Sequence, residues 1–371
     1  GGTAAAPAAG TAPSRRPPGR TLALAGAGLL GLAAAAAIAV TAARGPAGTA
    51  GHQPPPEAVE HYLAGVYEWE RRTPESLARA RDHFEAAIAR DPDYAAAHAG
   101  LADAWLLLRE YSDVPDEEAY ARAEAAAGRA LALDDRLADA HAALAFVAFY
   151  GRRDFNAGRR GFRRATELDP SSARAHHWHG TALLHIGEFR PALAEVEAAR
   201  RLDPRSRSIL ADKGLILYFA GEKEAGIALL RRMAAQEPGF HSPRAHLAII
   251  HMAEGDLAAW LAEAREAARL RGDADRLELL DAAARALAGG GEQAMLGALL
   301  AGQTRLHAAG RESFYALGAT HALLGDRASA LRFLEQALAR REPALVGLRI
   351  DPAFAALRGD PGYRRVLERI G

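Results

Sequence analysis

The sequence contains no cysteine. Disulfide bonds, thiolate metal sites and cysteine nucleophiles are therefore excluded. Aromatic residues make up only 6% of the chain, although 50% of its residues are hydrophobic. The apolar content is consequently mostly alanine and leucine, which are strong helix formers. This composition favours a helical protein.

The chain also lacks an excess of either charge, because it has 46 basic and 46 acidic residues. A nucleic-acid-binding surface usually requires a basic excess, so the composition predicts no nucleic acid bound by this chain itself. Lysine is nearly absent, and almost all basic residues are arginine. The first residue is Gly1 rather than methionine. We therefore expect an effector domain upstream of the segment given by this sequence.

Three segments of distinct composition precede the main body of the chain. Residues 1–20 are rich in Gly, Ala and Pro and predict a flexible cytoplasmic linker. Thr21–Ala43 contains no charged residue, and at about 1.5 Å per residue it is long enough to span a bilayer core. A cleaved signal peptide is the alternative. Residues 44–57 form a second linker rich in Pro and Gly.

The arginines before the apolar segment predict its orientation. More arginines precede Thr21–Ala43 than closely follow it. The positive-inside rule then places the N-terminus in the cytoplasm and the large C-terminal part outside a bacterial inner membrane. Small residues in the segment would also allow two such helices to approach, so a homodimer is a further option.

The main body repeats with a fixed spacing. Three sets of residues recur at intervals of 34 residues, and they include Pro170, Pro204 and Pro238 together with Gly187, Gly221 and Gly255. Proline ends one helix and begins the next unit, whereas glycine suits the tight turn between two helices. The pattern predicts pairs of antiparallel helices from about residue 58 onward, with no strand.

Large and small residues alternate at fixed positions within each unit. A large–small pair recurs on the first helix, and a small–large–small trio recurs on the second, as in Ala192/Val196/Ala199. The first-helix pairs are Leu101-Ala102, Leu144-Ala145, His179-Gly180, Lys213-Gly214, Leu247-Ala248 and Leu317-Gly318. These residues resemble the tetratricopeptide repeat (TPR). The resemblance implies an all-α, right-handed superhelical solenoid of about eight units over residues 58–342, whose concave groove binds a polypeptide.

Residues 343–371 differ from the repeats. Asp351-Pro352 and Asp360-Pro361 each predict an N-cap followed by proline at the first helical position. The short helices would form a C-terminal helical cap. This segment resembles the end of membrane-anchored bacterial signalling proteins, such as CadC-like winged-helix regulators, serine/threonine kinases and adenylate cyclases. The resemblance implies an extracytoplasmic sensor or scaffold. A free-standing envelope assembly scaffold is the alternative.

The repeat register also predicts which side chains line the groove. Aromatic residues at helical spacing more often belong to a core than to a binding surface, so both interpretations stay open for this set. The predicted groove residues are Asp103, Leu106, Phe146, Phe149, Tyr150, Arg174, His177, Thr181, Leu184, Tyr218 and Phe219.

Nothing in the sequence predicts catalysis. The histidine cluster at residues 176–179 suggests a metal site or a pH sensor, but His98, His141 and His176 recur at one repeat position, which favours a packing role. The glycine run at residues 289–291 is not followed by a phosphate-binding motif and predicts a turn between helices. We therefore expect no catalytic residue, no metal and no cofactor.

Overall fold

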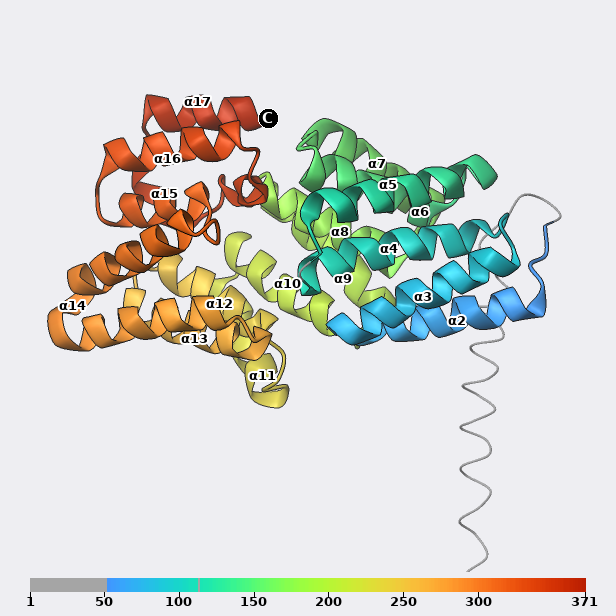
Figure 1. The fold of residues 1–371 in the computed structure, drawn as a ribbon, viewed down its shortest axis with the longest axis horizontal. Coiled ribbons are helices and arrows are strands. Elements are labelled where there is room, and N and C mark those ends of the chain that lie inside the picture. Colours follow the sequence, from blue (N-terminus) through green and yellow to red (C-terminus); the bar gives the residue numbers. More distant parts are fainter. Residues whose placement is uncertain (1–51, 113) are drawn as a thin grey trace, which may run out of the picture. The chain divides into compact units, whose positions relative to one another are not determined.

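The computed structural model describes residues 52–112 and 114–371, which belong to one compact unit, Gly48–Gly371. In these residues every regular element is a helix, and no strand occurs (Figure 1). No helix of the described part is long and apolar enough to cross a membrane. The linker at residues 1–20 and the predicted transmembrane segment Thr21–Ala43 lie outside the described residues.

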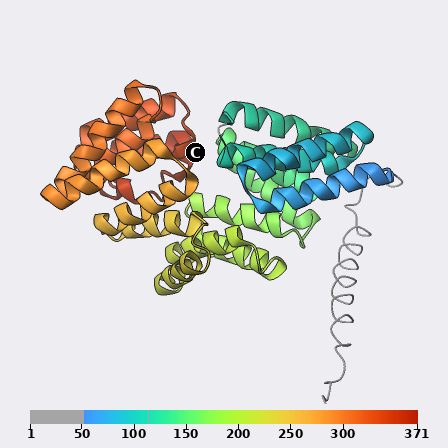
Figure 2. The ribbon, with the colours of Figure 1, turned by 60° about the horizontal axis from the view of Figure 1, so that its bottom comes forward.

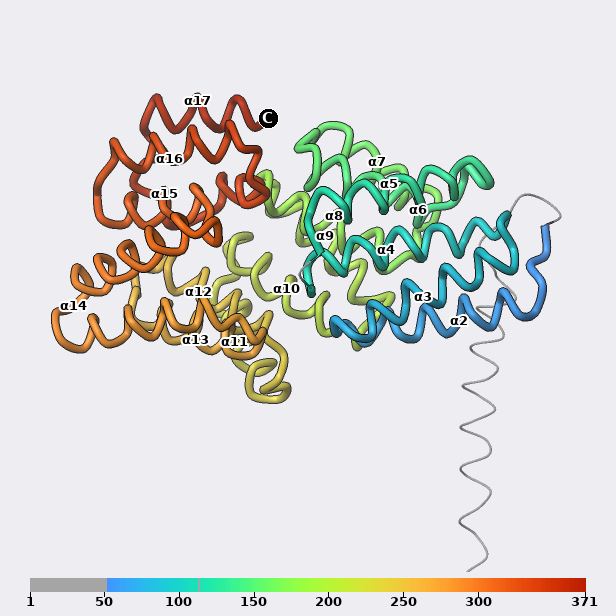
Figure 3. Tube along the Cα trace, in the orientation of Figure 1, coloured from blue at the N-terminus to red at the C-terminus, as the bar shows by residue number. Residues whose placement is uncertain are grey.

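The helices follow one another in pairs, as Figures 2 and 3 show along the chain. Their bounds are α2 Pro56–Arg71, α3 Pro74–Arg90, α4 Ala95–Tyr111, α5 Asp116–Leu133, α6 Ala138–Phe146, the π-helical turn η1 Val147–Gly151, α7 Phe155–Leu168, α8 Ala173–His185, α9 Phe189–Leu202, α10 Arg207–Phe219, α11 Lys223–Gln236, α12 Ser242–Ala253, α13 Leu257–Arg271, α14 Ala274–Ala308, α15 Phe314–Leu323, α16 Arg327–Ala339, the 3₁₀ helices η2 Pro343–Gly347 and η3 Pro352–Leu357, and α17 Pro361–Ile370. This succession confirms the predicted all-α repeat of helical hairpins of the TPR type.

The hairpins depend on glycine at two kinds of position. Gly187, Gly221 and Gly255 end the turns after α8, α10 and α12 with φ values of 83°, 96° and 80°, a conformation that favours glycine. Gly180 lies where α8 crosses α9, and an added Cβ there would lie 3.2 Å from the carbonyl oxygen of Ala192. The spacing of these residues therefore reflects turn geometry and close helix packing, as predicted.

The long helix α14 is itself a hairpin. Gly291 has φ 74° and ψ −167°, so the helix breaks there into two parts. Leu279 from the first part packs against Gly302 of the second. A Cβ added at Gly302 would lie 2.3 Å from Cδ1 of Leu279. The turn predicted within residues 289–291 is confirmed, and the described residues contain eight hairpins between α2 and α16.

The recurring histidine has a structural role. The Nε2 atoms of His98, His141 and His176 lie 2.9, 2.8 and 3.1 Å from the carbonyl oxygen of the residue six positions earlier. That carbonyl lies in the loop between two hairpins, where it cannot accept a hydrogen bond from a helical N–H. Each imidazole therefore fastens the loop to the following first helix, and the packing role is confirmed.

The C-terminal segment reaches further than the last hairpin. Helix α17 packs on α16, where a cap is expected, but η2 and η3 contact α12, α15 and η1. Val346 joins the core of the first hairpins, and Ile350 joins the core formed around α8 and α10. The guanidinium group of Arg153 donates to the carbonyl oxygen of Glu342 over 3.0 Å. The segment therefore connects the last hairpins with the middle of the array.

Candidate functional site

Three adjoining hollows form a trough along the first helices α8, α10 and α12. The apolar hollow (about 470 Å³) is lined by α8, α10, α12, α13, α14, α15 and the C-terminal segment. The middle hollow (about 320 Å³) and the outer hollow (about 710 Å³) continue it toward the ends of α2 and α4. Arg271 lines all three hollows, and Asp212 and His246 line the first two. The hollows are therefore continuous, and we call them together the trough.

The two walls of the trough come from hairpins far apart in the sequence. Tyr111 ends α4, whereas His241 precedes α12, and their ring centroids lie 6.2 Å apart in an edge-to-face arrangement. Both residues line the middle and outer hollows together with Arg72 and Glu110. The curvature of the array thus encloses the trough on a second side.

An aspartate held by two histidines forms the floor of the middle hollow. Asp212 of α10 accepts hydrogen bonds from Nε2 of His177 over 2.6 Å and from Nε2 of His246 over 2.8 Å. Burial opposes ionisation of Asp212, but these two hydrogen bonds outweigh it and hold the pKa of its carboxyl group well below its ordinary value. We call these three residues the imidazole cluster.

The other polar groups of the floor are bonded within α6, η1 and α8. The Nδ1 atom of His185 donates to the carbonyl oxygen of Thr181 over 2.8 Å, and the hydroxyl group of Tyr150 donates to Oγ1 of Thr181 over 3.2 Å. Burial lowers the pKa of His185, so its imidazole stays neutral at neutral pH. This part of the floor is polar but carries no charge.

A second charged cluster lies on the neighbouring first helices but lines none of the three hollows. The guanidinium group of Arg174 lies 2.5 Å from a carboxylate oxygen of Asp103 and 2.5 Å from one of Asp139. It also stacks against Trp69 and Trp178. We call Asp103, Asp139 and Arg174 the acid-rich cluster.

The acid-rich cluster has more carboxylates than cations. Burial, reinforced by Asp139, raises the pKa of Asp103 to about 7, although Arg174 works against that shift. Burial alone would lower the pKa of Arg174, but the two acids hold it above its ordinary value. Both pKa values are therefore raised, as expected when two carboxylates share one guanidinium group. Each acid then receives only part of the positive charge of Arg174.

Some of the predicted groove residues come together in the trough. The middle hollow is lined by Phe146, Tyr150, His177 and Thr181, and the apolar hollow by Thr181 and Leu184. Contact between these side chains and a ligand stays a prediction, because no ligand is present.

The other predicted groove residues lie elsewhere. Leu106 and Phe149 are fully buried in the core, and Asp103 and Arg174 belong to the acid-rich cluster. Phe219 stacks on Phe189, and Tyr218 donates a hydrogen bond to Glu254 on a neighbouring hairpin. These positions are occupied by packing within the array, since the first helices are covered on more than one face.

Four residues of the trough, Asp212, His246, Arg72 and Arg271, were not among the predicted groove residues. Asp212 follows His177 by 35 residues, and His246 follows Asp212 by 34, so the repeat spacing itself was a usable signal. Arg72 and Arg271 are 199 residues apart and carry no such signal. Their proximity depends on the curvature of the array.

No group of three or more His, Asp or Glu residues within residues 52–112 and 114–371 could hold a metal ion. In the imidazole cluster each carboxylate oxygen of Asp212 already accepts an imidazole N–H at hydrogen-bond distance, which is longer than a metal–ligand bond. His176 and His179 both lie against Glu195 instead. His176 and His179 therefore connect α8 with α9, whereas His177 connects α8 with α10.

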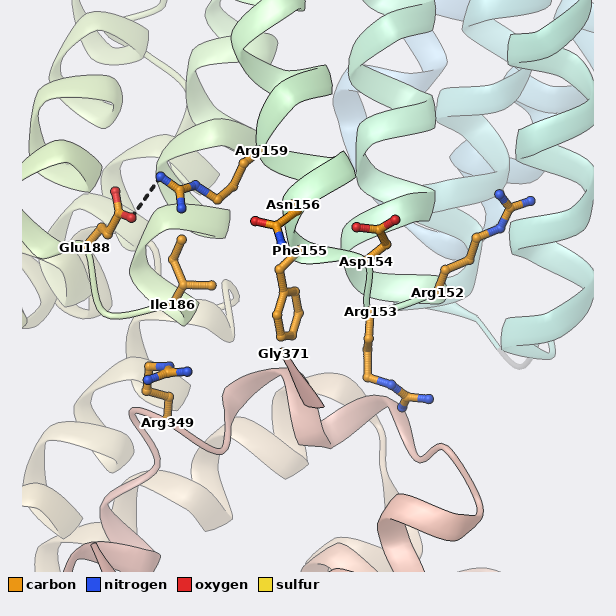
Figure 4. A pocket seen from close by; sticks show the side chains of 10 residues that line it. All are labelled: Arg152, Arg153, Asp154, Phe155, Asn156, Arg159, Ile186, Glu188, Arg349 and Gly371. Atoms are coloured by element: carbon orange, nitrogen blue, oxygen red, sulfur yellow. Dashed lines mark ion pairs between the residues drawn. The ribbon is translucent and has the colours of Figure 1, made fainter. Parts of the chain in front are cut away.

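A separate hollow of about 570 Å³ lies where the C-terminal segment meets α7 and the turn after α8 (Figure 4). It is rich in arginine, and Arg349 and Arg153 approach it from opposite sides. Arg159 is already paired with Glu188 over 2.9 Å. Gly371 lies against Phe155 in the same hollow. We assign this hollow to the packing of the C-terminal segment.

Comparison with known proteins gives distant similarities only, and no family model matches the chain. The transcriptional regulator HilA of Salmonella typhimurium, and the proteins of the same name from Salmonella typhi and Salmonella paratyphi A, are 25% identical over 158 residues. That alignment covers 43% of this chain but only 28% of the length of these relatives. The chain therefore corresponds to less than a third of each of them.

Among solved structures, the chain is similar to PilW, a type IV pilus biogenesis factor, with a TM-score of 0.44 and 21% identity over 60% of this chain and 96% of that chain. It is also similar to yeast Tom70, with a TM-score of 0.43 and 15% identity over 86% of this chain and 69% of that chain. A third similar structure is YrrB, a TPR protein with an unusual peptide-binding site. Its TM-score is 0.35 and its sequence identity is 17%, over 53% of this chain and 95% of that chain. These similarities are too distant to carry a conclusion about function.

Proposed function

We propose that the trough binds a segment of another polypeptide. The continuity of the three hollows carries this proposal, since a chain segment needs an elongated site rather than one closed cavity. The apolar hollow has mainly apolar walls, and the middle and outer hollows add polar and charged groups, a combination suited to a specific binding site. In an array of this kind the hairpins provide a rigid frame, and binding requires no reaction chemistry.

We further propose that the chain is the extracytoplasmic sensor or scaffold part of a membrane-anchored bacterial signalling regulator, whose cytoplasmic winged-helix domain lies outside this sequence. The uncharged segment Thr21–Ala43 and the arginines before it support the anchor and its orientation. The similarity of part of the chain to transcriptional regulators supports a regulatory role. A winged helix in the coding sequence directly upstream would support this proposal, whereas a kinase domain there would contradict it.

Selection of binding peptides tests the role of the trough. The full chain in detergent is used to select from a library of displayed random peptides, and the affinity of each selected peptide is measured by fluorescence anisotropy. Ala245 lines both the apolar and the middle hollow, so Ala245→Trp should fill the trough and weaken binding at least about tenfold.

The matched control places the same large side chain outside the trough. Ala194 is exposed on α9 and lines no described hollow, so Ala194→Trp should bind the selected peptides like the wild type. The proposal fails if no peptide is selected, or if both tryptophan variants bind as well as the wild type. Circular dichroism of both variants shows whether the helices are retained.

The absence of cysteine allows a clean test of membrane orientation. Single cysteines are introduced as Ser14→Cys in the N-terminal linker and Ala194→Cys in the array. Intact cells are made permeable at the outer membrane only and treated with a membrane-impermeant maleimide. We expect labelling at position 194 and none at position 14. The reverse pattern, or loss of the chain from the membrane fraction, would contradict the proposed anchor.

A further inference from the structure

Arg72 holds an unusual backbone conformation at the edge of the trough. It ends α2 with φ 51°, in the left-handed region that favours glycine. Its guanidinium group lies 4.6 Å from the ring centroid of Trp69 and lines the middle and outer hollows. It makes no ion pair with any of the described residues. Its guanidinium group thus has an aromatic neighbour but no acidic partner, and it faces the trough.

Arg271 faces the trough from the opposite wall. It is the last residue of α13, it is exposed, and it lines all three hollows. Within the described part of the chain, no carboxylate forms an ion pair with it. Burial, reinforced by the charge of Arg271, lowers the pKa of His241 to about 4, so this imidazole is neutral at neutral pH.

Five carboxylates line the trough, and none forms an ion pair with Arg72 or Arg271. Asp275 pairs with Arg311, Asp273 accepts the backbone N–H of Arg276, and Asp351 accepts from the hydroxyl group of Tyr315. Both carboxylate oxygens of Asp212 already accept imidazole hydrogen bonds. Glu110 forms no ion pair with Arg72; the surrounding protein raises the pKa of its carboxyl group, and the charges of Arg109 and Arg72 oppose that shift. The nearby Arg109 pairs with Asp116, and its Nε atom is buried without a hydrogen-bond partner. Two cations, Arg72 and Arg271, thus remain available for a ligand.

The opposite end of the trough is apolar. Leu184, Leu215, Ile249 and Met252 line the apolar hollow, and Trp260 closes it. Ile249 and Met252 are only partly buried, so apolar surface faces the hollow. A ligand segment lying along the trough would therefore meet Arg72 at the middle and outer hollows, Arg271 along its length, and aliphatic surface in the apolar hollow.

We propose, on the basis that the trough is a polypeptide site, that its ligand carries an acidic side chain bound between Arg72 and Arg271 and an apolar side chain that enters the apolar hollow. Guanidinium groups bind carboxylates through charge-assisted, often bidentate hydrogen bonds, which fixes the register of the segment. Burial of the apolar side chain supplies affinity. The ligand class is thus an acidic peptide with a neighbouring hydrophobic residue.

The probe is an array of peptides with acetylated N-termini and amidated C-termini, so that only side chains carry charge. Each peptide holds two glutamates and one leucine in a Gly/Ser background, and the separation between them is varied along the series. Copies with glutamine or lysine in place of glutamate complete the set. We expect the full chain to bind glutamate peptides at one preferred separation, at least about tenfold more tightly than their glutamine copies. Lysine copies should not bind.

Variants of the two arginines assign the interaction. Arg72→Gly removes the guanidinium group while placing glycine where φ is positive, so the melting temperature should not fall below that of the wild type. Glutamate peptides should nevertheless bind it about tenfold more weakly, whereas glutamine copies should be unaffected. Arg271→Gln should behave in the same way. Arg341→Gly is the matched control, because Arg341 also has a positive φ of 54° but lines none of the three hollows. It should leave peptide binding unchanged.

The outcomes separate this inference from the proposed function. Equal binding of glutamate and glutamine peptides, with loss of both in Ala245→Trp, would overturn the acidic preference but leave polypeptide binding in the trough intact. Tighter binding of the lysine copies would also overturn it and would point to Glu110 as the recognition group. Full binding by Ala245→Trp would contradict the trough itself. Retained affinity in Arg72→Gly and Arg271→Gln would show that another group recognises the acid.

Discussion

The acid-rich cluster and the imidazole cluster lie on neighbouring first helices, yet their compositions are opposite. In the first, two carboxylates share the single guanidinium group of Arg174. In the second, the single carboxylate of Asp212 accepts from two imidazoles. Helix α8 contributes to both, because Arg174 and His177 lie three residues apart on it. Helix α8 therefore links a cluster with more carboxylates than cations to a cluster with more imidazoles than carboxylates.

The comparison shows that the number of partners, rather than burial alone, decides how a buried aspartate titrates. Desolvation is the largest influence on both Asp103 and Asp212, and it raises the pKa in each case. Two donors reverse the shift at Asp212, whereas half of one guanidinium does not reverse it at Asp103. The pKa of Asp103 therefore lies close to neutral pH, whereas Asp212 stays a carboxylate there.

Removing the shared cation should break the acid-rich cluster with the largest effect. Arg174→Met leaves Asp103 and Asp139 without their guanidinium group, and loss of one partner from a buried ion pair costs about 3–5 kcal/mol. We expect a lower urea midpoint by circular dichroism, with partial recovery when Asp103→Asn is added. Arg163→Met, at an exposed position on α7 without a side-chain ion pair, should change stability by no more than about 0.5 kcal/mol. Equal shifts in the two variants would contradict the shared-cation interpretation.

Removing the shared acceptor tests the imidazole cluster. Asp212→Asn offers one acceptor oxygen in place of two, so one imidazole N–H loses its partner, at a cost of about 1–3 kcal/mol. The native pKa of Asp212 lies below its unfolded value of 3.8, so its contribution is present above that pH and is lost as the pH falls through the native pKa. The difference between variant and wild type in urea unfolding should therefore be full at pH 7 and shrink below pH 3.8. A stability difference that grows below pH 3.8 would contradict this role of Asp212.

The repeat spacing predicted most of the fold because its causes are local. Turn glycines such as Gly187, and close-packing positions such as Gly180, depend only on two adjacent helices. The same spacing placed His177 and Thr181 on the trough side of α8. Leu106 and Phe149 were placed in the groove by the same register, but they are buried because neighbouring hairpins cover that side of their helices.

The trough as a whole could not be predicted, because its opposite wall comes from a different part of the array. Arg72 and Arg271 line the same hollows only because the hairpins between them curve, and that curvature sums small rotations from one unit to the next. The position of η2 and η3 against α12 is likewise a tertiary contact between segments remote in sequence. Asp212 was within reach of sequence reasoning, since it lies one repeat length from two histidines.

The smallest expected effect on stability comes from replacing Asp103 of the acid-rich cluster. Its pKa is about 7 in the native chain and 3.8 when unfolded, so between these values the native state holds a proton that the unfolded state has released. Stability contributed by this group is therefore complete below pH 3.8 and is lost as the pH rises through about 7. Asp103→Asn keeps the size of the protonated acid but cannot ionise. We expect a net change in unfolding free energy within about 1 kcal/mol at pH 8, because the lost penalty of ionisation is offset by a weaker bond to Arg174.

The informative measurement is the slope of unfolding free energy against pH from 4 to 8, which should be less negative in the variant than in the wild type. An unchanged slope would mean that Asp103 is ionised throughout that range, and that one guanidinium is enough for two carboxylates.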